Sequence, residues 1–116
     1  MKAETLARRV VDALEELKAL DVKVIDVRGQ TSITDVMVIA SGRSDRQVRA
    51  LADKTVETAK KLKVPPIGTE GEREGEWILV DLGDVIVHLM HPSARAYYQL
   101  EKLWGEGAPK AKSKTG

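Results

Sequence analysis

The most informative stretch of the chain is EWILVDLGDVIVHLM, residues 76–90, in which two apolar runs flank a glycine. Both runs are rich in aliphatic and β-branched residues, a pattern that predicts two strands joined by a tight turn. The shortest hairpin loop that fits is Leu82-Gly83. With that loop, Asp81 lies directly opposite Asp84, and the two strands pair outward from there.

Side chains alternate along a strand, so the hairpin has two faces of different chemistry. One face is aliphatic and carries Ile78, Val80, Val85, Val87 and Leu89. The other, here called the mixed face, carries Trp77, Leu79, Asp81, Asp84, Ile86, His88 and Met90. In the predicted register Trp77 lies opposite His88. We expect the aliphatic face to be covered by the core, and the part of the mixed face around Trp77, His88 and Met90 to be exposed.

Two like charges facing each other across a hairpin cost stability, so Asp81 and Asp84 require an explanation. Aspartate readily caps a turn through its own side chain, which is one interpretation. The other is that the two carboxylates bind a partner. The residues alone leave both interpretations open.

Length and composition predict a single domain over residues 1–104, followed by a disordered lysine-rich tail at 105–116. A hydrophobic fraction of 42% with 32% charged residues is typical of a globular protein. The chain has no cysteine, which excludes disulfides, thiolate metal ligands and a cysteine nucleophile.

Charge and hydropathy narrow the partners. The tail has three lysines and one glutamate, which give it a net charge of +2. Since the net charge of the whole chain is +1, the first 104 residues have a net charge of −1. A nearly neutral fold has no evident basic patch, and we expect no direct sequence-specific binding of nucleic acid. The longest apolar run, residues 36–40, is too short to cross a membrane. Because the N-terminus also lacks a secretory signal pattern, the expected location is cytoplasmic.

The periodicity along the chain predicts the order α-β-β-α-β-β-α. Helices are expected at residues 4–20, after Ser44, and after an N-cap at Ser93; strands are expected at 22–28, 35–41, 67–72 (a short edge strand) and in the hairpin. Residues 36–40 are apolar on both faces, which indicates a central strand. The fold class is therefore α+β, a sandwich of a mixed sheet with helices mainly on one face.

The aromatic residues are confined to the last 40 residues, at Trp77, Tyr97, Tyr98 and Trp104, and the chain has no phenylalanine. Tryptophan and tyrosine are enriched at the energetic centres of interfaces, so a partner site is most plausible here. Packing of the last helix onto the sheet explains the same residues equally well.

Catalytic chemistry finds little support in the sequence. Asp81 and Asp84 could share a divalent cation, but no third acidic ligand follows at a suitable spacing, and the two histidines do not suggest a zinc site. Ser44 with Gln47 fits a helix capping box better than a phosphate cradle. We therefore expect no catalytic residues, no metal and no cofactor. A nucleotide-binding enzyme remains the alternative.

Four segments together resemble the ribosomal silencing factor family, also called the Iojap-related family: SITDVMVIASGRSDRQVRALAD, PPIGTEGE, WILVDLGDVIVHLM and ARAYYQLEKLW. The match runs in order from about residue 22 to residue 104. The resemblance implies a fold similar to nucleotidyltransferases without their catalytic carboxylate pattern.

The resemblance also implies a non-enzymatic translation repressor. Such a protein binds the fourteenth protein of the large ribosomal subunit and blocks joining of the small subunit, which lowers translation when nutrients are scarce. The positions carried over as partner-binding are Trp77, Asp81, Asp84, His88, Met90 and Tyr98. A homodimer is also expected. Ribosomal proteins are generally basic, so the acidic groups of the mixed face would complement such a partner.

Overall fold

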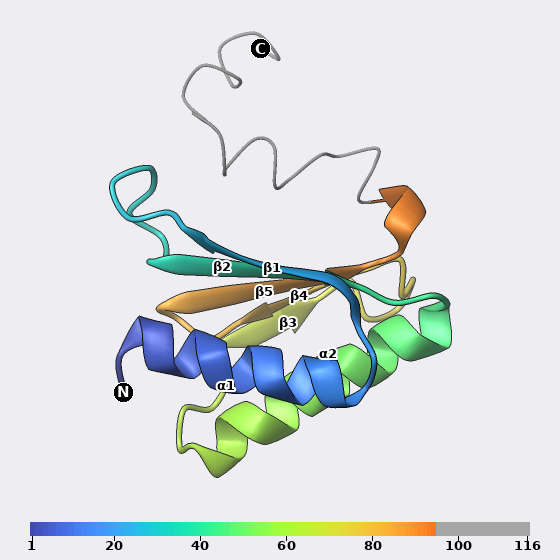
Figure 1. Cartoon of the computed structure of the whole chain (residues 1–116), viewed down its shortest axis with the longest axis horizontal. Coiled ribbons are helices and arrows are strands. Elements are labelled where there is room, and N and C mark those ends of the chain that lie inside the picture. The colour runs from blue at the N-terminus through green and yellow to red at the C-terminus, as the bar shows by residue number, and fades with distance from the viewer. Residues whose placement is uncertain (95–116) are drawn as a thin grey trace, which may run out of the picture.

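The computed structural model describes residues 1–94, which form a five-stranded mixed sheet with two long helices on one side (Figure 1). The elements in chain order are α1 (Ala3–Glu16), β1 (Leu20–Asp26), β2 (Val36–Ser41), α2 (Asp45–Lys61), β3 (Gly68–Glu70), β4 (Trp77–Asp81) and β5 (Val85–Met90). The strands lie in the order β1-β2-β5-β4-β3, in which only the β2–β5 pair is parallel. The predicted α+β class and mixed sheet are confirmed.

A third helix begins at Pro92, since residues 92–94 are already helical. The prediction of Ser93 as its N-cap is therefore wrong by at least one residue. Proline is well suited to the first helical position, because its fixed φ matches the helix and its missing N–H would have no partner there. Tyr97, Tyr98, Trp104 and the lysine-rich tail lie outside the described residues.

The main core lies between the helices and the sheet. Val10 and Leu14 of α1 and Leu51 of α2 are fully buried against Val38 of β2 and Leu89 of β5. Burying each such side chain stabilises the fold by about 1.5–3 kcal/mol. The central position predicted for residues 36–40 is confirmed, because every residue of β2 is buried and the strand lies between β1 and β5.

Both long helices end in the same way, at a lysine with positive φ. After α1, Lys18 has φ 63°, the Lys18 amide donates to the Glu15 carbonyl, and the Ala19 amide donates to the Leu14 carbonyl. This pair of hydrogen bonds defines a Schellman motif. It ends the helix at Glu16, four residues before the predicted end, and lets β1 begin at Leu20.

The same motif follows α2. Lys63 has φ 64° and donates its amide to the Lys60 carbonyl, while the Val64 amide donates to the Ala59 carbonyl. A non-glycine residue in this left-handed conformation costs stability. Glycine or asparagine at this position would have predicted the motif from the sequence, whereas lysine does not.

The hairpin register differs from the predicted one. The loop is Gly83-Asp84, closed by a 2.9 Å hydrogen bond from the Leu82 amide to the Val85 carbonyl. Gly83 has φ +92°, and a two-residue hairpin needs positive φ at its first loop position, as in a type II′ turn. Asp81 therefore lies opposite Ile86, not opposite Asp84. The predicted repulsion between two facing carboxylates does not arise.

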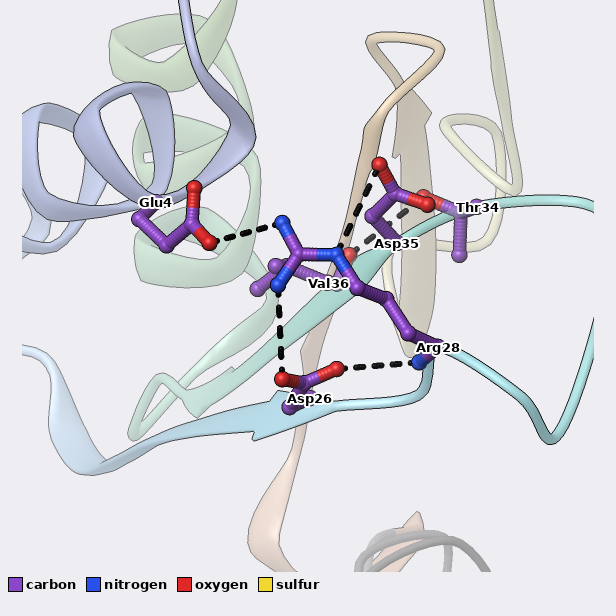
Figure 2. A network of polar contacts seen from close by, with 6 residues as sticks. All are labelled: Glu4, Asp26, Arg28, Thr34, Asp35 and Val36. Carbon is purple, nitrogen blue, oxygen red and sulfur yellow. Dashed lines mark hydrogen bonds and ion pairs between the residues drawn. The ribbon is translucent and has the colours of Figure 1, made fainter.

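Arg28 ties the N-terminus of α1 to the β1–β2 connection (Figure 2). Its guanidinium lies 2.7 Å from Glu4 Oε2, 3.4 Å from Asp26 Oδ2 and 3.9 Å from Asp35 Oδ2. A hydrogen bond from the Glu4 backbone and one from Arg28 both lower the pKa of Glu4. All four side chains are well exposed, so the network orients the loop without contributing much stability.

Candidate functional site

The two faces of the hairpin face opposite ways, as predicted. The shift in register moves each partner by two residues, and strand side chains alternate with a period of two, so the composition of each face stays the same. Ile78, Val80, Val85, Val87 and Leu89 belong to the core under the helices. Trp77 and Met90 belong to a second, smaller apolar cluster. The mixed face therefore lies on the side of the sheet away from α1 and α2.

This second cluster covers much of the mixed face. It consists of Val27, Met37, Ile39, Met90 and Ala94, with Ile25 and Trp77 packed against it. Met90 has no exposed surface and His88 is only 6% exposed. The prediction that Met90 and His88 are exposed is therefore wrong. The reason is the parallel pairing of β2 with β5, which places Met37 and Ile39 on the same face beside them.

The exposed part of the mixed face follows β4 instead. Trp77, Leu79 and Asp81 are each half-buried, whereas Ile86, His88 and Met90 of β5 are buried. β4 has only the three-residue β3 beyond it, whereas β5 is central. A partner approaching this side of the sheet from β4 would meet Trp77, Leu79 and Asp81 first.

Trp77 and His88 form the best-defined polar contact on this face. The indole Nε1–H of Trp77 donates to Nδ1 of His88 over 3.0 Å, with ring centroids 5.8 Å apart and planes tilted by 48°. The two residues are diagonal neighbours, because Trp77 lies opposite Met90 and Leu79 lies opposite His88. Burial lowers the pKa of His88 to about 4, so its imidazole is neutral near pH 7.

The two aspartates have different environments. Asp81 Oδ1 accepts a 2.8 Å hydrogen bond from the Gly83 amide, which confirms that this carboxylate caps the turn. The side chain of Asp84 is exposed at the second loop position. Its carbonyl accepts hydrogen bonds from the amides of Asp35 and Val36, which joins the hairpin loop to the start of β2. Both carboxylates lie at one end of the mixed face.

The loop before α2 is built for capping. Ser44 Oγ accepts from the Gln47 amide over 3.1 Å, and Gln47 Oε1 accepts from the Arg43 amide over 2.7 Å. The amide of Val48 donates to the Ser44 carbonyl. Ser44 is therefore the N-cap of α2, which confirms the capping interpretation of Ser44 and Gln47.

Residues 1–94 are the part of the chain that the structure describes. Within them, no three histidine, aspartate or glutamate side chains gather closely enough to hold a metal ion. No helix in this part of the chain is long and apolar enough to cross a membrane. His91, the second histidine, pairs through Nε2 with Asp45 Oδ1 at 3.2 Å and does not approach the Trp77–His88 pair as a co-ligand.

Four residues of the second cluster lie behind the site and were not predicted as part of it: Val27, Met37, Ile39 and Ala94. The available signal was alternation: odd-numbered residues of the apolar run 36–40 must face away from the helices if even-numbered ones face them. Tyr98, the remaining predicted site residue, lies outside the described residues.

A family model described as "Ribosomal silencing factor during starvation" matches residues 1–115 of the chain. The chain belongs to the ribosomal silencing factor family. Membership makes it a silencing factor that acts on translation, and its bacterial relatives carry names of regulators rather than of enzymes.

Individual members of the ribosomal silencing factor family support the assignment. The ribosomal silencing factor of Haemophilus influenzae is 48% identical over 99 residues, covering 85% of this chain and 97% of that protein. A crystal structure of a Chromobacterium violaceum protein superposes with a TM-score of 0.88 at 42% identity, covering 90% of this chain and 88% of the other. A mouse protein named for mitochondrial assembly of the ribosomal large subunit is 39% identical over 98 residues, which span 82% of this chain and 43% of the mouse protein.

Proposed function

We propose that this protein binds the large ribosomal subunit through its fourteenth protein and blocks joining of the small subunit. Translation would fall as a result when nutrients are limiting. The observation that carries the proposal is family membership over nearly the whole chain. The mouse relative, whose name refers to assembly of the large ribosomal subunit, supports the choice of subunit. The site of action is then the cytoplasm, where bacterial ribosomes work.

The proposed contact surface is the exposed part of the mixed face. Trp77 supplies a half-buried aromatic group at the start of β4, and Asp81 and Asp84 supply negative charge at the turn that follows the other end of β4. This combination fits a basic ribosomal protein, because complementary charge favours fast and specific encounter while an aromatic anchor supplies affinity. Tyr98 is proposed as a further contact. Met90 and His88 are proposed to support this surface from behind rather than to touch the partner.

The direct experiment adds the purified protein to separated ribosomal subunits before they are mixed. We expect the protein to sediment with the large subunit and to reduce the fraction of assembled ribosomes. Sucrose-gradient profiles with and without the protein measure both quantities. Sedimentation with small subunits alone, or an unchanged assembled fraction, would contradict the proposal. Turnover of a nucleotide would favour the alternative of a nucleotidyltransferase-like enzyme.

Trp77→Ala is expected to weaken binding to the large subunit by about thirtyfold, because truncating an aromatic interface anchor typically costs about 2 kcal/mol or more. The dissociation constant should be measured by titrating labelled protein into large subunits. Val87→Ala is the matched control on the other face of the same hairpin, where Val87 is fully buried under the helices. It should lower the free energy of unfolding but leave the affinity of the folded protein unchanged.

A homodimer is proposed as well. β1 is an edge strand of the described sheet, and Val24 on this strand is 54% exposed. Unpaired edges are the usual place for one sheet to continue into another. The molecular mass in solution decides this point.

A further inference from the structure

His88 was predicted to touch the partner, yet its side chain is almost completely buried. A buried imidazole cannot contact a partner directly, but it can hold a neighbouring side chain through a hydrogen bond. Its Nδ1 accepts a hydrogen bond from Trp77 Nε1 over 3.0 Å. The buried His88 therefore holds the indole of Trp77, which is the more exposed of the two side chains. A buried side chain, His88, thus supports a side chain at the surface of the sheet, Trp77.

The hydrogen bond requires one particular form of the imidazole. A histidine nitrogen accepts only when it carries no proton, so Nδ1 must be bare and the ring proton must lie on Nε2. Burial among Met37, Ile39 and Met90 disfavours the charged form, in which both nitrogens would donate. The surroundings of His88 therefore maintain the acceptor that Trp77 needs.

We propose that His88 is a positioning residue, which fixes the orientation of the Trp77 indole through the Nε1–H···Nδ1 hydrogen bond and so presents Trp77 for partner binding. The inference rests on the proposed binding of the large ribosomal subunit through the mixed face. An indole held in its bound orientation before the encounter loses less side-chain freedom on binding, which corresponds to several-fold to about tenfold in affinity.

A purely structural role for His88 makes a different prediction. If the imidazole only fills space in the second apolar cluster, then an apolar side chain of similar size serves as well. If it only satisfies the indole N–H, then its loss affects stability and not binding. The variants His88→Leu, His88→Asn and His88→Gln separate these roles. The amide oxygen of asparagine takes the place of Nδ1, whereas that of glutamine takes the place of Nε2.

Binding to purified large subunits is measured for each variant under conditions where circular dichroism shows that it is folded. We expect His88→Leu and His88→Gln to bind about tenfold more weakly, equivalent to about 1.4 kcal/mol. His88→Asn should recover most of that loss, because it restores an acceptor at the same place. If His88→Leu does not fold, the contrast between asparagine and glutamine makes the same comparison.

A double-mutant cycle tests whether His88 acts through Trp77. Trp77→Phe removes the indole donor, so in that background His88→Leu should weaken binding by less than about twofold. A full tenfold loss in the Trp77→Phe background would overturn the proposal. Wild-type affinity in folded His88→Leu would overturn it as well.

The free protein provides a test that does not depend on ribosomes. The indole Nε1–H resonance of Trp77, assigned by its absence in Trp77→Phe, should move and exchange faster with solvent in His88→Leu but not in His88→Asn. If wild-type protein fails to bind large subunits, the proposed function is wrong, and this resonance alone decides the positioning role. An unchanged resonance in His88→Leu would refute that role while leaving the proposed function intact.

Discussion

Met90→Ala is expected to lower the free energy of unfolding by about 2–5 kcal/mol, the usual cost of truncating a buried methionine. Met90 has no exposed surface and lies on β5, between β2 and β4. It packs in the second cluster with Met37 and Val27, on the side of the sheet away from the long helices. Truncation leaves a cavity there, because neighbouring strands are fixed by hydrogen bonds and cannot move in to fill it.

Urea denaturation followed by circular dichroism measures this effect. Ile67→Ala is the control: Ile67 is an aliphatic residue with 73% of its surface exposed, and its truncation should change stability by less than about 0.5 kcal/mol. A domain of this size has a total stability of about 5–15 kcal/mol, so the expected loss for Met90→Ala is a large fraction of it. Unchanged stability combined with weakened binding would instead support the original prediction of Met90 as an exposed contact.

The sequence predicted the two faces of the hairpin correctly although it predicted the wrong register. The predicted and observed registers differ by two residues, and a shift of two conserves which side chains share a face. What decided the register was the position of Gly83 within the loop. The apolar pattern alone leaves open whether glycine takes the first or the second loop position. The positive φ of Gly83 fits the first position, as in a type II′ turn.

Burial on the mixed face could not be predicted from the hairpin alone. It depends on β2, which is separated from β5 by more than forty residues of chain and pairs with it in parallel. That pairing brings Met37 beside Ile86 and Ile39 beside His88. Local alternation identifies candidate faces, but only the strand order shows which of them has enough apolar neighbours to be covered.

The candidate site was likewise predictable in part. Trp77 stands out in the sequence because aromatic residues are scarce in this chain. In the observed register Trp77 and His88 are diagonal neighbours, and their hydrogen bond depends on that arrangement. The predicted register placed the two residues directly opposite each other, which is a different geometry. The helix ends at Lys18 and Lys63 were missed for a related reason: their left-handed backbone is imposed by the surrounding fold.

The stability of the protein is expected to fall as the pH is lowered from about 6.5 to about 4, because burial lowers the pKa of His88 from 6.5 to about 4. In this window the unfolded chain binds a proton at this histidine and the folded protein does not. The free energy of unfolding therefore rises with pH across the window, and the contribution is fully present above pH 6.5. A shift of this size corresponds to about 3 kcal/mol.

Comparison with His88→Asn isolates this contribution from that of the carboxylates. Glu4, whose pKa is lowered in the fold, loses its own contribution as the pH falls through its folded pKa, but it does so equally in both proteins. The stability of wild type relative to His88→Asn should therefore decrease by about 3 kcal/mol between pH 7 and pH 4 and remain constant above pH 7. Urea midpoints at several pH values supply the measurement. A difference that does not vary with pH would show that the imidazole of His88 is accessible to solvent and titrates normally in the folded protein. Trp77 would then lack a permanently neutral acceptor, and its orientation would depend on pH within the physiological range.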